Sequence, residues 1–86
     1  MTPLLAAIET GNYQIAELLI NSGTDVNAEN QNGWTPLLAA IETGNYQIAE
    51  LLINSGTDVN AEDQNGWPLF YAIEKGNYQI AELLIT

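Results

Sequence analysis

The amino-acid sequence predicts an all-α fold in which helix–turn–helix units with turn-bearing loops stack into a short solenoid. The main evidence is a repeat: residues 35–67 copy residues 2–34 at 32 of 33 positions, the one change being Asn30 to Asp63. Helix start and stop signals recur inside each copy, and each full copy closes on a polar segment ending in Asn-Gly. Repetition at this period is typical of solenoids, whose units bury a continuous core only by stacking.

A third copy is incomplete. Residues 68–86 match residues 36–54 at 15 of 19 positions, and the threonine that should precede the proline is missing. We therefore expect a single domain over residues 1–86, built from units 2–34, 35–67 and a partial unit 68–86.

The first helix of each full unit begins at a threonine–proline pair. In the second unit, Thr35 can cap the free amides of the first turn, and Pro36 has the backbone angle that suits the first helical position. Small and apolar residues 37–42 continue this helix, and Gly44 ends it. The third unit has no threonine before Pro68, so its first helix lacks the usual capping hydroxyl.

A second helix follows after the glycine. Asn45 can cap it, and apolar residues recur at helical spacing from Tyr46 to about Asn54. Residues 57–67 are polar and end in a strong tight-turn signal. Neither helix is long enough to be stable alone in water, so each must pack against its neighbours.

Composition excludes several classes of function. The chain has 86 residues, eleven of them acidic, with Lys75 as its single basic residue and a net charge of −10. One lysine cannot neutralise a row of phosphates, so we expect no nucleic-acid binding and no docking on anionic membranes. Because the sequence has no cysteine and no histidine, disulfides, thiol chemistry and imidazole metal sites are excluded as well.

The sequence also carries no signal for a membrane span or for export. Its apolar runs reach four or five residues, far short of a membrane span, and no charged-then-apolar leader opens it. The sequence does not name a compartment, and we expect a cytoplasmic location if the chain is natural.

The acidic residues do not predict a catalytic site, because they recur as identical copies in successive units and so belong to the scaffold. No histidine base, cysteine or Ser–Lys arrangement is present, and glycine-rich phosphate-binding motifs are absent. We predict no catalytic residue and no cofactor. The repeated carboxylates are Glu9, Glu42 and Glu74 in the first helices and Glu17, Glu50 and Glu82 in the second.

The alternation of Asp25, Asn27 and Glu29 has a weak likeness to a calcium-binding loop. The pattern then fails, because Asn30 stands where the sharp turn needs glycine and Pro36 stands where a bidentate glutamate is needed. A solvated turn in which Asp and Asn side chains bond their own backbone explains the segment better. We therefore predict no metal site.

The unit resembles the ankyrin repeat. The 33-residue period, the Thr-Pro-Leu opening, an alanine in the first helix, Gly-Asn between helices, and Leu-Leu followed by Gly-Thr-Asp-Val-Asn-Ala all match that family, and the resemblance covers the whole chain. It implies a solenoid that binds proteins through its concave face. One departure is systematic: the family's usual histidine, which hydrogen-bonds between repeats, is replaced by Leu5, Leu38 and Phe70. This departure implies a drier interior.

The resemblance also implies where a partner binds. In designed ankyrin repeat binders, the recognition positions lie in the turn and at the end of the first helix. Carried across, they are Gln31, Asn32, Trp34, Glu42 and Thr43, then Gln64, Asn65, Trp67, Glu74 and Lys75, with Glu9 and Thr10 from the first unit. Tyr71 joins them because Phe70 and Tyr71 replace Leu38 and Ala39, although repacking at the shortened junction is the competing interpretation.

The two tryptophans and three tyrosines need separate interpretations. Trp34 and Trp67 follow Asn-Gly, and each ring could pack on the helix that it precedes or stay partly exposed as a binding hot spot; the two roles are compatible. Tyr13, Tyr46 and Tyr78 open the second helices at a position that is core or half-buried in most versions of the resembled fold. We assign these tyrosines no function.

Three interpretations of function stay open. The main one is non-covalent binding of a protein partner whose surface is basic or neutral, through the concave face. The second is an engineered or truncated repeat chain without a partner of its own. The third is head-to-tail self-association, because Leu83, Leu84 and Ile85 keep the sequence of an internal unit, and each end should then show an apolar patch.

Overall fold

The computed structural model describes residues 2–57, 59 and 68–85, and in this part of the chain it contains six α-helices and no strand. The predicted helical repeat is confirmed, and the helices of the second unit begin at the two residues expected from the sequence. The helices are α1 (Pro3–Glu9), α2 (Tyr13–Asn21), α3 (Pro36–Thr43), α4 (Tyr46–Asn54), α5 (Pro68–Glu74) and α6 (Tyr78–Ile85).

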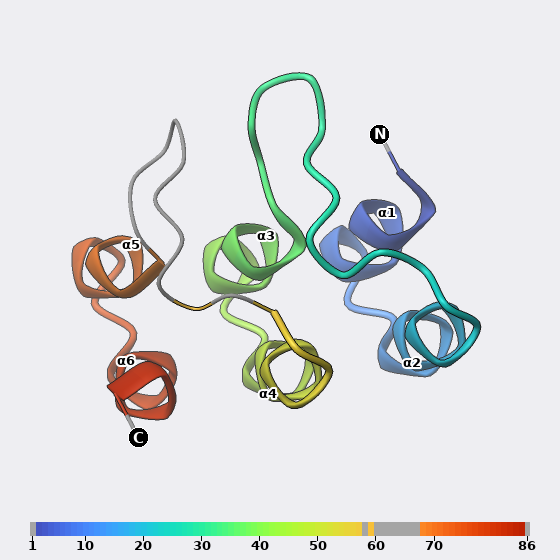
Figure 1. Ribbon diagram of the computed structural model, residues 1–86. Coiled ribbons are helices and arrows are strands. Elements are labelled where there is room, and N and C mark those ends of the chain that lie inside the picture. The colour runs from blue at the N-terminus through green and yellow to red at the C-terminus, as the bar shows by residue number, and fades with distance from the viewer. Residues whose placement is uncertain (1, 58, 60–67, 86) are drawn as a thin grey trace.

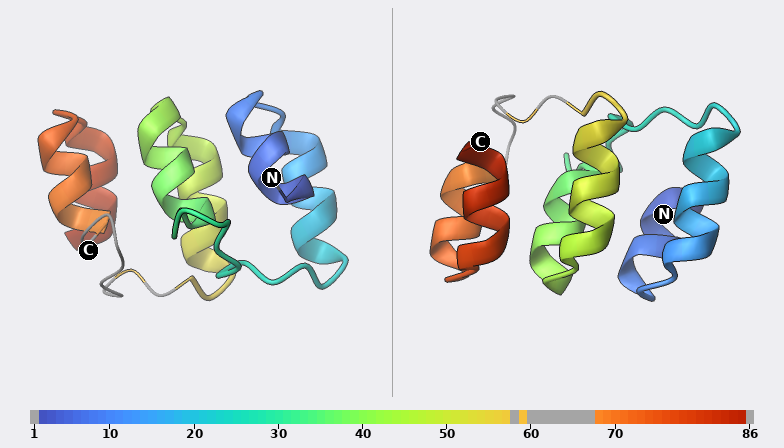
Figure 2. Two further views of the ribbon diagram at one scale, coloured as in Figure 1. Left: turned by 90° about the horizontal axis from the view of Figure 1, so that it is seen from above. Right: turned by 90° about the horizontal axis from the view of Figure 1, so that it is seen from below.

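The helices form two parallel rows. Figure 1 shows α1, α3 and α5 in one row and α2, α4 and α6 in the other, with the chain between α2 and α3 projecting beyond the first row. Helix α3 packs between α1 and α5, and α4 packs between α2 and α6. The two views of Figure 2 show the three helix pairs side by side, as expected for a short solenoid.

Side-chain caps fix where the helices begin. The hydroxyl of Thr2 accepts a hydrogen bond from the backbone N–H of Leu5 at 3.1 Å, and Thr35 accepts the same bond from Leu38 at 3.1 Å. Gly44 then ends α3 with a φ of +71°, a left-handed conformation that glycine adopts without steric cost.

The second helices use asparagine caps throughout. In each unit the side-chain oxygen of an asparagine accepts the backbone N–H three residues later, at 3.0–3.2 Å, as the sequence predicts for one of them. The capping residues are Asn12, Asn45 and Asn77.

The core is centred on the middle unit, because both of its faces are covered by neighbouring units. Leu37, Leu38 and Ile41 of α3 are fully buried, and so are the equivalent Leu4, Leu5 and Ile8 of α1. No polar or charged residue is buried in the described part of the chain. The drier interior expected from the leucine substitutions is therefore confirmed at Leu5 and Leu38.

The outer face of the third unit differs from this expectation. Phe70 is 56% exposed, although its counterparts Leu5 and Leu38 are fully buried. The expectation of a core or half-buried tyrosine is wrong for Tyr78, which is 76% exposed. Tyr46 is 38% exposed, and Tyr13 is half-buried.

Candidate functional site

The turn before α3 fixes the position of Trp34. The side-chain oxygen of Asn30 accepts hydrogen bonds from the backbone N–H groups of Asn32 at 2.8 Å and of Trp34 at 3.1 Å. The N–H of Asn30 donates to the carbonyl of Trp34 at 3.0 Å, and Gly33 has a φ of +78° in the tight turn between them. The backbone of Trp34 is thus fixed just before the start of α3, and its side chain is half-buried.

The preceding segment is a turn of the kind expected instead of a calcium loop. The carboxylate of Asp25 accepts a hydrogen bond from the backbone N–H of Asn27 at 2.9 Å, which confirms that this side chain bonds its own backbone. In the part of the chain that the structure describes, no three Asp, Glu, His or Cys side chains come together as a metal site would need.

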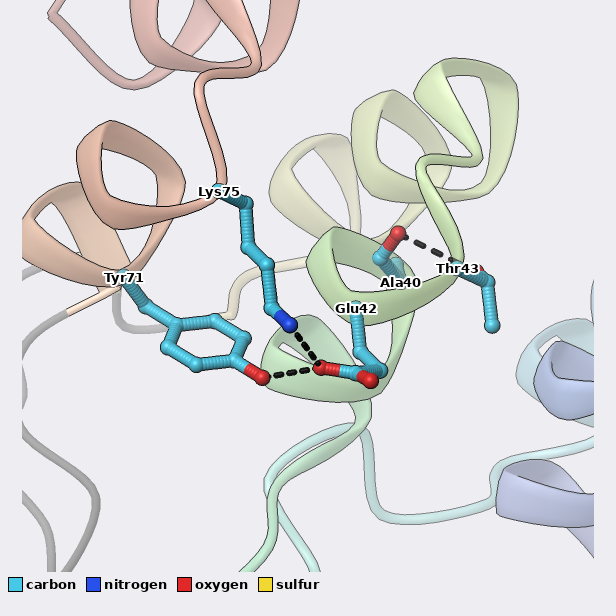
Figure 3. A network of polar contacts seen from close by, with 5 residues as sticks. All are labelled: Ala40, Glu42, Thr43, Tyr71 and Lys75. Atoms are coloured by element: carbon cyan, nitrogen blue, oxygen red, sulfur yellow. Dashed lines mark hydrogen bonds and ion pairs between the residues drawn. The ribbon is translucent and has the colours of Figure 1, made fainter.

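A polar cluster joins α3 to α5 (Figure 3). The ammonium nitrogen of Lys75 lies 3.1 Å from Oε2 of Glu42, and the hydroxyl of Tyr71 donates to the same oxygen. The lysine nitrogen also lies 5.4 Å from the centroid of the Tyr71 ring, within the range of a cation–π contact. Tyr71 and Lys75 are four residues apart, so they share one side of α5 and reach Glu42 together.

These contacts set the protonation of the cluster. The hydrogen bonds from Tyr71 and then from Lys75 lower the pKa of Glu42. Burial, followed by the bond to Glu42, raises the pKa of Tyr71, and the bond to Glu42 raises the pKa of Lys75. At neutral pH the cluster therefore holds an ionised carboxylate, a neutral phenol and a charged ammonium. The ammonium and the carboxylate form an ion pair, so no group in the cluster is available as a general base.

An aromatic contact links this cluster to the turn. The rings of Trp34 and Tyr71 have centroids 5.5 Å apart and an interplanar angle of 74°, an edge-to-face arrangement. Both side chains are half-buried. Trp34 is not enclosed in the core, and it therefore stays a candidate binding residue.

A groove lies on the other side of α3. It has a volume of about 310 Å³ and brings together residues of α1, the turn and α3. Its walls combine two carboxylates, an indole and small side chains. The lining residues are Glu9, Trp34, Ala39, Glu42 and Thr43.

We define the inner face as the surface formed by residues 30–34 and the C-terminal ends of α1, α3 and α5. The structure brings several predicted site residues together there: Glu9, Trp34, Glu42, Thr43, Tyr71 and Lys75. The other predicted residues of the inner face are exposed at its edge: Gln31 and Asn32 at the turn tip, and Thr10 and Glu74 at helix ends. Gln64, Asn65 and Trp67 lie outside the described residues.

Two features of the site are missing from the sequence-based prediction. The first is Ala39, whose short side chain helps to leave the groove open. The second is the contact of both Tyr71 and Lys75 with Glu42. A usable signal was present, because Tyr71 and Lys75 replace Ala39 and Thr43 together and are spaced by one helical turn.

A comparison with protein families agrees with this geometry. The model for ankyrin repeats, in three copies, matches residues 4–86. The chain belongs to the ankyrin repeat family. Ankyrin repeats generally mediate protein–protein interaction and are typically non-catalytic. No curated protein matches the sequence. Among the described helices of this ankyrin chain, none has the length and apolar character required to cross a membrane.

Proposed function

We propose that this ankyrin repeat chain binds a protein partner through its inner face and catalyses no reaction. The observation that carries the proposal is the position of Trp34. The Asn30 turn holds its backbone, and its indole packs edge-to-face against Tyr71 and lines the groove, half-buried. A rigid aromatic side chain in such a place is typical of the residues that dominate binding energy at protein interfaces.

The charges of the inner face indicate the kind of surface that it accepts. Glu9, Glu42 and Glu74 lie in the last turns of the three first helices, and the single base of the chain, Lys75, is already paired with Glu42. A partner with a basic or neutral surface fits this field, whereas an acidic one is repelled. Added salt should therefore slow the association.

A selection of random dodecapeptides displayed on phage tests the proposal. Peptides selected on the unaltered chain should lose affinity at least about tenfold for Trp34→Ala. They should bind Gln47→Ala normally, because Gln47 is an exposed residue of α4, in the other row of helices. Peptides that bind both variants equally would place recognition outside the inner face.

The second interpretation, an engineered or truncated repeat chain without a partner, predicts a different outcome. The near-identity of the two full units also suits such a chain. In that case the selection should yield no peptide whose binding depends on Trp34.

Head-to-tail self-association is a second candidate function, because large apolar side chains are exposed at both ends of the helix rows. Ile73 of α5 is 60% exposed, whereas its counterpart Ile41 is covered by the next unit. At the other end Leu18 of α2 is 64% exposed and Ile15 is 47% exposed, whereas Ile48, the counterpart of Ile15, is fully buried. The exposed side chains at each end thus correspond to side chains that pack between units inside the same chain. A second copy of the chain presents the opposite end, whose apolar side chains can pack against them.

A further inference from the structure

The two junctions between units use equivalent helices, but the later helix presents different side chains to the glutamate of the earlier one. Between α3 and α5, Tyr71 and Lys75 extend from the later helix to Glu42 on the earlier one. Between α1 and α3, the equivalent positions on the later helix are Ala39 and Thr43. The equivalent of Glu42 on the earlier helix is Glu9.

The small side chains leave the first junction open. The groove of about 310 Å³ lies at Glu9, Ala39 and Thr43, where the second junction holds a phenol and an ammonium. The hydroxyl of Thr43 donates to the carbonyl of Ala40 at 3.2 Å (Figure 3). The ion pair Lys75–Glu42 is the one formed within the described residues, so Glu9 has no cationic partner there.

The chain itself shows which chemistry fits such a place. At the second junction the cation of Lys75 meets the carboxylate while its side chain runs beside the Tyr71 ring. At the first junction the indole of Trp34 supplies the aromatic wall and Glu9 supplies the free carboxylate. A long cationic side chain can lay its methylene stem on such a wall and keep its charge at the carboxylate.

We propose that the groove between α1 and α3 receives a lysine or arginine side chain of the protein partner, with its cation at Glu9 and its stem along Trp34. This inference rests on the proposed protein-binding function and specifies the chemistry of the partner. Glu42, which lines the same groove, adds a second negative charge to it although its Oε2 is shared with Lys75.

Other occupants fit the groove less well. An acidic side chain is repelled by the carboxylates, and a purely apolar one leaves Glu9 desolvated without a partner. A calcium ion takes six to eight oxygen ligands, more than the carboxylates of Glu9 and Glu42 supply. A cationic side chain satisfies the charge and the apolar wall together.

Titration of the full 86-residue chain with N-acetyl-lysine-N′-methylamide tests the inference directly. The indole N–H resonance of Trp34, assigned with Trp67→Phe, reports on the groove by nuclear magnetic resonance. We expect a saturable shift with the lysine probe, and at least about tenfold weaker binding of the norleucine analogue, which has a similar stem but no charge. Equal binding of the two probes would overturn the inference.

Two variants examine the groove itself. Glu9→Gln removes the exposed carboxylate with little change in size and should weaken the lysine probe at least about tenfold, while Glu50→Gln on the exposed side of α4 should not. The double change Ala39→Tyr with Thr43→Lys copies the α5 pair into α3, and it should fill the groove and abolish the shift. Retained binding in Glu9→Gln would overturn the inference even if the double variant failed to fold.

The reverse exchange gives a gain of binding. Tyr71→Ala with Lys75→Thr removes the phenol and the ammonium that contact Glu42, and it should create a second site for the lysine probe at that carboxylate. A chain that shows no saturable shift with the probe has no such groove site. It still binds proteins through the inner face if selected peptides depend on Trp34 but need no basic residue, so the two proposals fail in distinguishable ways.

Discussion

Glu42 receives two side chains from the following unit, and one of them is the single basic residue of the chain. The pair is exposed, with 45% of the Glu42 side chain and 41% of the Lys75 side chain accessible, so water and salt screen the attraction. The main effect of these contacts is to orient Tyr71, whose ring then packs against Trp34. A hydrogen bond to the exposed carboxylate of Glu42 thereby helps to place an aromatic residue of the candidate site.

Replacing Lys75 by methionine keeps the stem and removes the charge, and it should lower the melting temperature slightly at neutral pH. Because the folded state lowers the pKa of Glu42, the contribution of the pair is present above the unfolded pKa and is lost as pH falls through the folded value. The difference between the two chains should therefore shrink below about pH 4. Thermal melts from acidic to neutral pH measure it, and an unchanged difference at low pH would contradict this account.

Tyr71→Ala should cost more than the loss of the lysine charge, because it removes the ring contact with Trp34. Aromatic pairs of this geometry contribute about 0.5–1.5 kcal/mol beyond their buried area. A double-mutant cycle with Trp34→Ala, measured by urea denaturation, isolates this coupling. Tyr71→Phe keeps the ring and serves as the control, and a coupling near zero would show that the rings touch without stabilising the junction.

At the scale of the helices, capping residues control where each element begins. Thr2 and Thr35 accept the backbone N–H of the third residue of α1 and α3, and asparagines do the same for the second helices. Loss of one such cap costs about 1 kcal/mol. The third unit has no threonine before Pro68, so α5 begins without the residue that caps its counterparts.

Inserting threonine between Trp67 and Pro68 should raise the melting temperature, because it restores the cap and the full period of the repeat. Thr35→Ala calibrates the effect in the same chain and should lower the free energy of unfolding by about 1 kcal/mol. Scanning calorimetry of both variants measures the two changes. If the insertion lowers the melting temperature, the shortened junction is itself required for the packing of Tyr71 at the neighbouring unit.

The helices could be predicted from sequence because their boundaries depend on local signals. The proline after Thr35, the left-handed Gly44 and the asparagine that follows it each act on adjacent backbone, and the repeat presents them twice in full. The cluster at Glu42 could not be predicted in the same way. It joins residues of different units, and only the packing of α5 on α3 brings Tyr71 and Lys75 to the carboxylate.

At the scale of the whole molecule, charge and apolar surface act in opposite directions. The net charge of −10 repels a second copy, whereas Ile15 and Leu18 at one end and Phe70 and Ile73 at the other favour its docking. Salt screens the repulsion and leaves the apolar contact in place. The balance between monomer and oligomer should therefore depend on ionic strength.

We expect the 86-residue chain to associate more strongly as protein concentration and salt increase. Sedimentation equilibrium from low salt to about 0.5 M salt measures this association, since the screening length falls from tens of ångströms to a few over that range. A chain that stays monomeric at high concentration in about 0.5 M salt would exclude head-to-tail association. Gln47→Ala is the matched control, and it should associate as the unaltered chain does.

Blocked ends distinguish head-to-tail contact from a symmetric dimer. Phe70→Gln with Ile73→Gln disables one end, and Ile15→Gln with Leu18→Gln disables the other. Each variant alone should be monomeric, whereas an equal mixture should form a dimer and no larger species, because only one complementary pair of ends is left. A symmetric dimer uses the same end of both copies. It would therefore still form in the variant whose other end is blocked, and mixing the two variants would not increase its amount.

The groove beside Trp34 belongs to the junction between two nearly identical units, and such a junction can be copied. Inserting another copy of residues 35–67 would add one further groove, displaced by the spacing of packed helices, about 10 Å. The number of cationic side chains that one chain can bind would then increase with the number of units. A partner with cationic side chains at the same spacing would gain affinity with each added unit through avidity, whereas a partner with a single such side chain would gain only a statistical factor.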